Sequence, residues 1–157
     1  MKPAKRLWEH IVAPENLRLA FWKAAKGKWQ RDSVRRFSAN LEAELATMGT
    51  QLRDETFRVG RFTTFQIFDP KERTIHAAAF PERVLHHAIM NVCEPEFERW
   101  LIDDTFACRI GKGRLAAIGR SEQFAARYEW YLKMDVRKYF DSIDHRVLLA
   151  LLERKFG

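Results

Sequence analysis

The first fifty residues carry apolar side chains at the spacing of amphipathic helices. A short helix is predicted over residues 4–12, and Pro14 opens a second one that ends near Gly27. A third begins at Ser33, as its N-cap, and Gly49 is the expected stop. The three apolar stripes are Leu7, Trp8 and Ile11; Leu17, Ala20, Phe21 and Ala24; and Val34, Phe37, Leu41, Leu45 and Met48.

Between residues 58 and 79 the pattern changes to one typical of strands. An aromatic, β-prone run covers residues 62–68, and residues 73–77 provide a returning strand. The intervening Asp69-Pro70-Lys71-Glu72 suits a turn, because Pro presets φ at the second turn position. We therefore expect a β-hairpin with Arg73 just past its tip.

Helical spacing returns at Pro81, with Leu85, Ala88, Ile89 and Val92 as the core stripe. Pro95 is expected to interrupt this helix before a short one that carries Phe97, Trp100 and Leu101. Residues 105–110 can form a short strand. The Gly111-Lys112-Gly113 turn then leads into a helix that runs to about Tyr128, with Ala117, Phe124 and Ala125 facing inward.

The stretch from Trp130 to His145 combines a strand pattern with polar chemistry. Apolar and polar residues alternate over residues 130–136, which predicts a strand with one buried face and places Asp135 on the other face at its end. A helical pattern begins after Asp144. A carboxylate at a strand end, with an aromatic ring five residues later at Phe140, suits a hard cation beside a shaped pocket; Mg²⁺ takes one or two protein carboxylates and leaves positions for phosphate oxygens.

Composition limits the class of protein. At 157 residues with 46% hydrophobic side chains, the chain can build a core but is at most one ordinary domain. Two cysteines are too few for a disulfide framework, and no Cys/His spacing matches a zinc site. No apolar run approaches the roughly 18 residues of a membrane span, and the N-terminus lacks the apolar core of a signal peptide. We therefore expect a cytoplasmic protein with reduced thiols and no membrane partner.

The net charge of +7 is unevenly distributed. Residues 1–40 hold ten Lys or Arg against three Asp or Glu, whereas the remainder holds eighteen of each. This asymmetry predicts an electrostatic footprint for nucleic-acid phosphates, with Lys23, Lys26 and Lys28 clustered near a helix end. The alternative is a solvated helical face.

The eleven residues from Asp135 to His145, Asp-Val-Arg-Lys-Tyr-Phe-Asp-Ser-Ile-Asp-His, resemble the first catalytic motif of bacterial reverse transcriptases, of the diversity-generating, retron and group II intron types. The resemblance implies that Asp135 binds the catalytic Mg²⁺ pair. It also implies that Phe140 is the steric gate against ribonucleotides and that Val136 lines the dNTP site. The alternative is an ordinary strand, loop and helix, with Asp144 as N-cap and Phe140 in the core.

Other blocks resemble the same family in the same order. Residues 69–75 resemble its fingers hairpin, which implies that Arg73, and less strongly Lys71, contacts the dNTP phosphates; the alternative is an exposed basic tip. Residues 80–88 resemble a block in which the family usually has Asp where Glu82 stands, and Arg83 is the residue expected to contact template. The adjacent His86 and His87 do not form a metal site, because neighbouring helical residues point in different directions.

The Gly111-Lys112-Gly113 turn resembles the family's glycine-lysine-glycine turn, but Arg114 and Leu115 replace its usual Thr and His. It lacks the spacing of a P-loop, and it can be a plain helix-entry turn. Asp103 and Asp104 are expected to be surface residues. The nucleic-acid contacts that we predict are Arg83, Arg109, Lys112, Arg114, Lys23, Lys26 and Lys28, with Arg120 as a further basic residue that can grip a template backbone.

The family's paired aspartates, in a Tyr-x-Asp-Asp hairpin, are absent from these residues. The prediction is therefore an α+β chain with an incomplete right-hand polymerase fold: a basic helical region (1–50), fingers (51–128) and the start of a palm (129–157). In the complete enzyme it would bind RNA template, DNA primer and dNTP with Mg²⁺. Alone it is expected to be inactive, because two-metal catalysis needs a second carboxylate source. The alternatives are a non-catalytic RNA-binding or interaction module, and half of a split enzyme completed by another palm chain or accessory protein.

Overall fold

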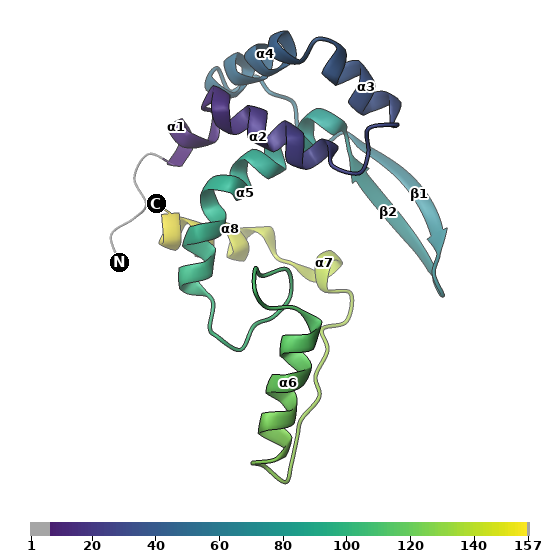
Figure 1. Cartoon of the computed structure of the whole chain (residues 1–157), viewed down its shortest axis with the longest axis vertical. Coiled ribbons are helices and arrows are strands. Elements are labelled where there is room, and N and C mark those ends of the chain that lie inside the picture. Colours follow the sequence, from purple (N-terminus) through teal and green to yellow (C-terminus); the bar gives the residue numbers. More distant parts are fainter. Residues whose placement is uncertain (1–6, 157) are drawn as a thin grey trace. The chain divides into compact units, whose positions relative to one another are not determined.

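The computed structural model describes residues 7–156 and is mostly helical α+β. Within that range there are eight helices and one antiparallel hairpin (Figure 1). The described residues divide into two compact units, residues 7–94 and residues 95–156, which we call the helix–hairpin unit and the C-terminal unit. The boundary between the two units lies at Pro95. The division into residues 1–50, 51–128 and 129–157 is expected on functional grounds and stays a prediction.

The helix–hairpin unit is built around the buried ring of Phe21. The ring lies on α2 (Pro14–Ala25), stacks on Phe37 at a centroid distance of 5.7 Å and meets Phe80 edge-on at 6.0 Å. These partners come from α3 (Asp32–Ala39) and from the first turn of α5 (Phe80–Trp100). The apolar stripe predicted for α2 and most of the next one therefore do form the core, whose largest fully buried side chains are Phe21, Leu17, Val34 and Val84. Of the first predicted stripe Ile11 is buried, but Trp8 is 47% exposed.

The first helices differ in their limits from the sequence prediction. The short helix is α1 (Leu7–Ile11), and the predicted third helix is two helices, because Asn40 leaves the helical region at φ −134° and ψ 44°. The Asn40 carbonyl then accepts the N–H of Glu44 and opens α4 (Leu41–Arg53). Gly49 does not stop α4; it is buried where α4 packs on α2, and a Cβ there would lie 3.5 Å from Leu17 Cδ1.

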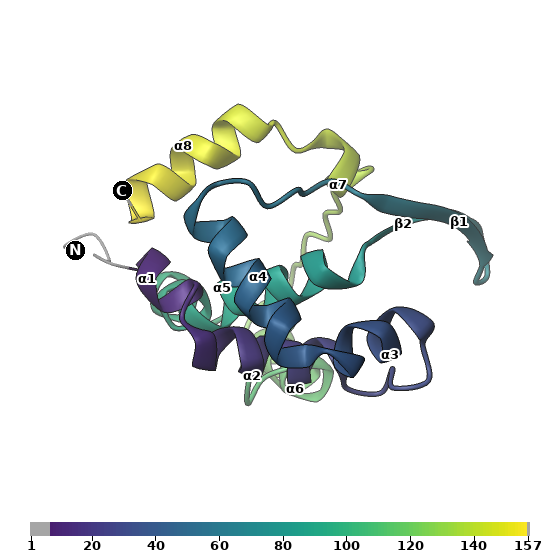
Figure 2. The same cartoon turned by 90° about the horizontal axis from the view of Figure 1, so that it is seen from above.

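The predicted hairpin is confirmed. Strand β1 (Phe62–Phe68) pairs antiparallel with β2 (Glu72–Ala78), from Phe62 opposite Ala78 to Phe68 opposite Glu72. Both views show it extending away from α2, α3 and α4 (Figures 1 and 2). All seven β1 residues are exposed, which leaves Phe68 80% accessible. The backbone pairing therefore forms without a packed face.

Helix α5 begins at Phe80, one residue before the predicted start, and continues through Pro95 to Trp100. The expected interruption at Pro95 is thus wrong. Proline at this position removes one backbone bond, to the carbonyl of Asn91, but the remaining bonds carry the helix on.

The C-terminal unit contains α6 (Arg114–Ala125), α7 (Tyr139–Ser142) and α8 (His145–Phe156). Phe156 packs edge-on against Phe97 of α5, with ring centroids 5.2 Å apart. Asp144 caps α8, since its Oδ1 accepts the N–H of Arg146 at 2.8 Å. The capping role considered for Asp144 is therefore confirmed, and α6 ends near the predicted limit. No residue of α6 is buried. Ala117, Phe124 and Ala125, which are expected to face inward, are therefore not core residues.

Two predicted strands do not form. Residues 105–110 make turns around Cys108, whose φ is +57°, and residues 130–136 belong to neither helix nor strand. A strand is stable only when a neighbour takes up its backbone hydrogen bonds. Within residues 7–156 the hairpin strands pair only with each other. The alternating side chains of residues 130–136 consequently have no sheet to enter, and Trp130 is 89% exposed.

None of the described helices combines the length and apolar character needed to cross a membrane.

Candidate nucleic-acid interface

A side-chain network joins α2 to α5 within the helix–hairpin unit. Asn16 donates from Nδ2 to the carbonyls of Ile11 at 2.9 Å and Ala88 at 3.0 Å. Asn91 donates from Nδ2 to Asn16 Oδ1 at 2.9 Å, and Lys23 donates from Nζ to Asn91 Oδ1 at 2.6 Å. This network fixes Lys23 beside the middle of α5.

The network brings together basic residues that lie far apart in the sequence. The pKa of His87 is held below its usual value. Burial is the largest cause, followed by the positive charges of Lys28, Lys23, His86 and Arg83. Their repulsion shows that these cations are close enough to interact. We call Lys23, Lys28, Arg83 and His87 the basic cluster. Three of the predicted nucleic-acid contacts, Lys23, Lys28 and Arg83, therefore lie near His87, and neighbouring cations suit a phosphate backbone.

Arg83 is held at this surface by an aromatic ring. Its Cζ lies 5.4 Å from the centroid of Phe80, a cation–π geometry. Arg83 Nε is buried and has no hydrogen-bond partner anywhere in residues 7–156. A buried donor without an acceptor is costly, so an acceptor oxygen supplied by a ligand would be favoured here.

Glu82 is buried at the start of α5 and is 5% exposed. Both of its carboxylate oxygens accept the backbone N–H of Gly60 at 3.1 Å. A hollow of about 310 Å³ opens beside it, with Arg58 and Arg61 among the lining residues. Glu82 therefore anchors the segment that enters the hairpin, a role that the sequence analysis did not assign.

The two hairpin residues predicted to contact dNTP phosphates are exposed. Arg73 lies opposite Ile67 in the second pair from the tip, and Lys71 lies in the turn. Across the strands, Thr64 Oγ1 is 2.9 Å from His76 Nδ1. Arg73 is thus presented to solvent on a hydrogen-bonded ribbon, where its guanidinium can take a phosphate in a bidentate geometry.

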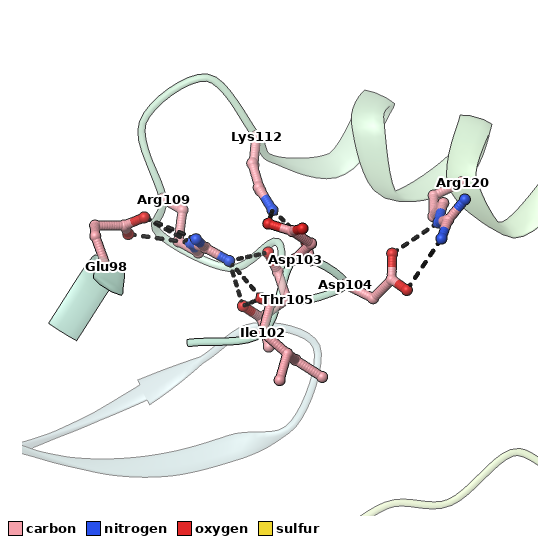
Figure 3. A network of polar contacts seen from close by, with 8 residues as sticks. All are labelled: Glu98, Ile102, Asp103, Asp104, Thr105, Arg109, Lys112 and Arg120. Carbon is pink, nitrogen blue, oxygen red and sulfur yellow. Dashed lines mark hydrogen bonds and ion pairs between the residues drawn. The ribbon is translucent and has the colours of Figure 1, made fainter. Parts of the chain in front are cut away.

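Arg109 has a different environment from the one expected (Figure 3). Its side chain is only 8% exposed, and its guanidinium forms a forked ion pair with Glu98 at 2.8 Å. Nη1 also donates to Thr105 Oγ1 at 2.6 Å and to the carbonyl of Ile102 at 2.8 Å. This pairing raises the pKa of Arg109 and lowers the pKa of Glu98. Arg109 therefore holds the loop after α5 together, and we leave it out of the interface.

Two further basic residues of the C-terminal unit have acidic partners (Figure 3). Lys112 donates to the carbonyl of Asp103, and its Nζ lies 5.4 Å from the ring centroid of Phe106. Arg120 Nε donates to Asp104 Oδ1 at 2.7 Å, and this hydrogen bond lowers the pKa of Asp104. Arg114, on the first turn of α6, is exposed. Asp103 and Asp104 are surface residues, as expected, but Asp104 also positions Arg120.

The residues of the proposed polymerase motif are exposed. Asp135 and Val136 precede a turn at Lys138, whose φ is +50°. Phe140, the second residue of the short α7, is 84% exposed. The Phe140 ring contacts Tyr139 edge-on, with centroids 5.2 Å apart. The alternative of an ordinary strand, loop and helix places Phe140 in the core, and this part of it is wrong.

The described residues do not form a metal centre. Across residues 7–156, no group of three or more His, Cys, Asp and Glu side chains is placed to hold an ion. A Mg²⁺ pair at Asp135 would need carboxylates in addition to those described here.

The residues that assemble this surface are not apparent from sequence patterns alone. Asn16 and Asn91 are 75 positions apart, and each is a half-buried amide on an amphipathic helix, where such a group signals a tertiary hydrogen bond. Glu82 offered a similar signal beside Phe80 and Pro81. The sequence does not show which group each of these side chains hydrogen-bonds to, because the partner depends on the tertiary fold.

No protein family model matches this chain, and no curated protein matches it either.

Proposed function

We propose that this chain carries the fingers and the first palm motif of a bacterial-type reverse transcriptase. Its helix–hairpin unit would bind template RNA and the dNTP phosphates, and Asp135 would be one ligand of the catalytic Mg²⁺ pair. The observation that carries the proposal is the order of the sequence blocks, from the hairpin block at residues 69–75 to the Asp135 motif. Resemblance in several blocks in one order is far more specific than resemblance in one.

The hairpin supports the phosphate-binding part of the proposal. Its strands and turn fall where the fingers block predicts them, and Arg73 and Lys71 are both exposed near the tip. The aromatic side chains Phe62, Phe65 and Phe68 on the same ribbon are also exposed. Arg73 would then orient the triphosphate, while Phe140 and Val136 would face the sugar.

The basic cluster supports the template-binding part. Lys23 and Lys28 come from the basic N-terminal region and Arg83 from the block expected to contact template, and these three cations all act on His87. Such a surface binds phosphates with a strong dependence on salt.

The exposed apolar side chains of residues 130–136 support a palm origin. Trp130, Leu132 and Met134 are each more than 80% exposed and alternate as one face of a strand would. Additional palm strands would give this segment hydrogen-bond partners and would cover that face. The Asp135 carboxylate would then project at the strand end beside its metal-binding partners.

The deciding experiment combines sequencing with an activity assay. The nucleotide sequence after the Gly157 codon is read for a Tyr-x-Asp-Asp block, and the complete frame is assayed for primer extension on an RNA template. We expect extension that Asp135→Ala abolishes while RNA binding stays within about twofold, since Asp135 is exposed and outside the basic cluster. Full extension by Asp135→Ala would refute the role of Asp135.

One observation favours a second function, an RNA-binding module without catalysis. The basic cluster is complete in the described residues, whereas the metal site is not. An immediate stop codon after Gly157, with salt-sensitive RNA binding and no primer extension, would select this alternative. If a separately encoded palm chain restored extension on mixing, a split enzyme would be the correct interpretation.

A further inference from the structure

Two exposed tryptophans lie beside the basic cluster and have no role in the function proposed above. Trp22 is 52% exposed on α2, and Trp29 is 42% exposed in the loop that follows. Their ring centroids are 5.3 Å apart with the planes inclined by 53°. Large indole surfaces left open to water beside several cations call for an explanation in terms of a ligand.

The pair is held rigidly. The buried Phe21 ring contacts Trp22 at 5.4 Å and Trp29 at 5.9 Å, both edge-on. Gly27, at φ +71°, reverses the chain after α2, and Lys28 donates its N–H to the Ala25 carbonyl at 2.8 Å. This turn returns Trp29 to the end of α2. The indoles are thus preorganised, which reduces the entropy lost when a ligand orders them.

Cations border the pair. Lys23 and Lys28 are the immediate sequence neighbours of Trp22 and Trp29, and both belong to the basic cluster. Lys26 is the C-cap residue of α2, and its backbone N–H donates to the Trp22 carbonyl at 3.1 Å. Trp22 also lines a hollow of about 540 Å³ together with Pro14, Glu15, Arg18 and Leu19. An aromatic pair, open space beside one of its rings and three lysines within a few residues of it therefore occur at this end of α2.

We propose that Trp22 and Trp29 form a stacking platform for the bases of single-stranded nucleic acid whose phosphates are bound by Lys23, Lys26 and Lys28. Single-strand binding surfaces combine a positively charged track with aromatic rings, because every base offers a π-face. Bases of a duplex are already stacked on one another and cannot use such rings. The platform would select unpaired template over duplex and would tolerate any base.

This inference deepens the template-binding part of the proposed function and rests on it, but it can fail separately. Primer extension and the Asp135→Ala variant test the polymerase assignment. The tryptophan platform is tested by how binding depends on the bases. An active polymerase whose RNA affinity ignores Trp22 and Trp29 would retain the proposed function and overturn the platform.

The experiment compares two ligands and two proteins. The ligands are oligouridylate of about twelve nucleotides, within the usual site size of single-strand binding folds, and an abasic ribose-phosphate strand of equal length. The proteins are the wild-type chain and Trp22→Ala/Trp29→Ala, with Trp8→Ala as the matched control. Trp8 is 47% exposed in the same unit but lines an apolar hollow with Leu52, Phe57 and Leu85.

We expect the double substitution to weaken oligouridylate binding roughly 5- to 100-fold, the range for loss of base stacking. Abasic-strand binding should change by less than about twofold, and the salt dependence of log Kd should keep its slope, because no phosphate contact is lost. Trp8→Ala should behave as wild type. Equal losses for both strands, or no loss for either, would overturn the platform.

A second measurement does not depend on how well the double variant folds. Trp8, Trp100 and Trp130 are replaced by Phe, which leaves Trp22 and Trp29 as the only indoles. Oligouridylate should quench their fluorescence on binding, and the abasic strand and duplex RNA should not. Binding of oligouridylate without quenching would overturn the proposal and would leave the indoles as a surface for a protein.

Discussion

The carboxylate of Glu82 accepts the backbone N–H of Gly60 with both oxygens, each at 3.1 Å. The two residues are 22 positions apart, and the hairpin lies between them. The contact therefore closes the base of the hairpin onto the first turn of α5. It is supplemented by a backbone bond from the Ala79 N–H to the Arg61 carbonyl at 3.0 Å.

Glu82→Ala should lower the free energy of unfolding by about 1.5–3 kcal/mol, the usual worth of a hydrogen bond to a charged group. Glu82→Gln should lose less, because the amide oxygen can still accept the Gly60 N–H. The measurement is urea denaturation, with Glu44→Ala, an exposed position on α4, as the control. If both alanine variants lost the same free energy of unfolding, the hydrogen bond between Glu82 and Gly60 would not contribute measurably to stability.

Gly27→Ala should destabilise the chain by about 1–2 kcal/mol. Gly27 has φ +71°, and nothing lies within 4 Å of an added Cβ, so the cost comes from the left-handed backbone alone. Urea denaturation measures it, and Gly27→Asn should recover part of the loss, since Asn tolerates this conformation better than other residues. A neutral Gly27→Ala would mean that the loop adopts another conformation.

Gly49→Ala should have the opposite effect and stabilise by about 0.5–1 kcal/mol. Gly49 is inside α4, where glycine is entropically unfavourable. The atoms nearest to an added Cβ are Arg53 Nη1 at 3.4 Å and Leu17 Cδ1 at 3.5 Å, which are ordinary contacts. The same denaturation assay applies, and destabilisation would show that α2 and α4 pack more closely at this position.

The His87 imidazole should make both stability and RNA affinity depend on pH. Burial, followed by Lys28, Lys23, His86 and Arg83, lowers its pKa from the ordinary 6.5. The unfolded chain therefore takes up the proton at higher pH than the folded chain does, and the free energy of unfolding should fall as pH decreases from above 6.5 through the folded pKa.

A phosphate bound at the basic cluster favours the imidazolium. RNA binding should therefore tighten several-fold over the same acidic range. Titrations of wild type and His87→Gln, with His145→Gln on α8 as the control, measure this effect. If His87→Gln kept the whole pH dependence, another group would be responsible for it.

Arg109 and Arg114 should separate stability from binding. Arg109→Gln breaks the forked pair with Glu98 and should lower the Tm, yet leave the salt slope of RNA binding unchanged. Exposed Arg114→Gln should leave the Tm unchanged, and if Arg114 contacts a phosphate of a single strand the slope should decrease by about 0.7. A reduced slope for Arg109→Gln would return Arg109 to the interface.

Local sequence determined the elements whose hydrogen bonds close within a short stretch. Helix α2 begins at the expected Pro14 and ends just before Gly27, and the hairpin turns at Asp69-Pro70. Turn chemistry and helical periodicity act over a few residues, so they can be recognised without knowledge of the fold. The same holds for the excess of positive charge in the first forty residues.

The tertiary structure decided what depends on residues far apart in the chain. The alternating residues 130–136 satisfy the pattern of a strand, but a strand also needs a hydrogen-bonded neighbour, and none of the described segments is one. Similarly, the charge count could not show that Arg109 is neutralised by Glu98, whereas Lys23 is held beside α5 by Asn91. The sequence shows which side chains are charged, but packing determines which group each charge is paired with.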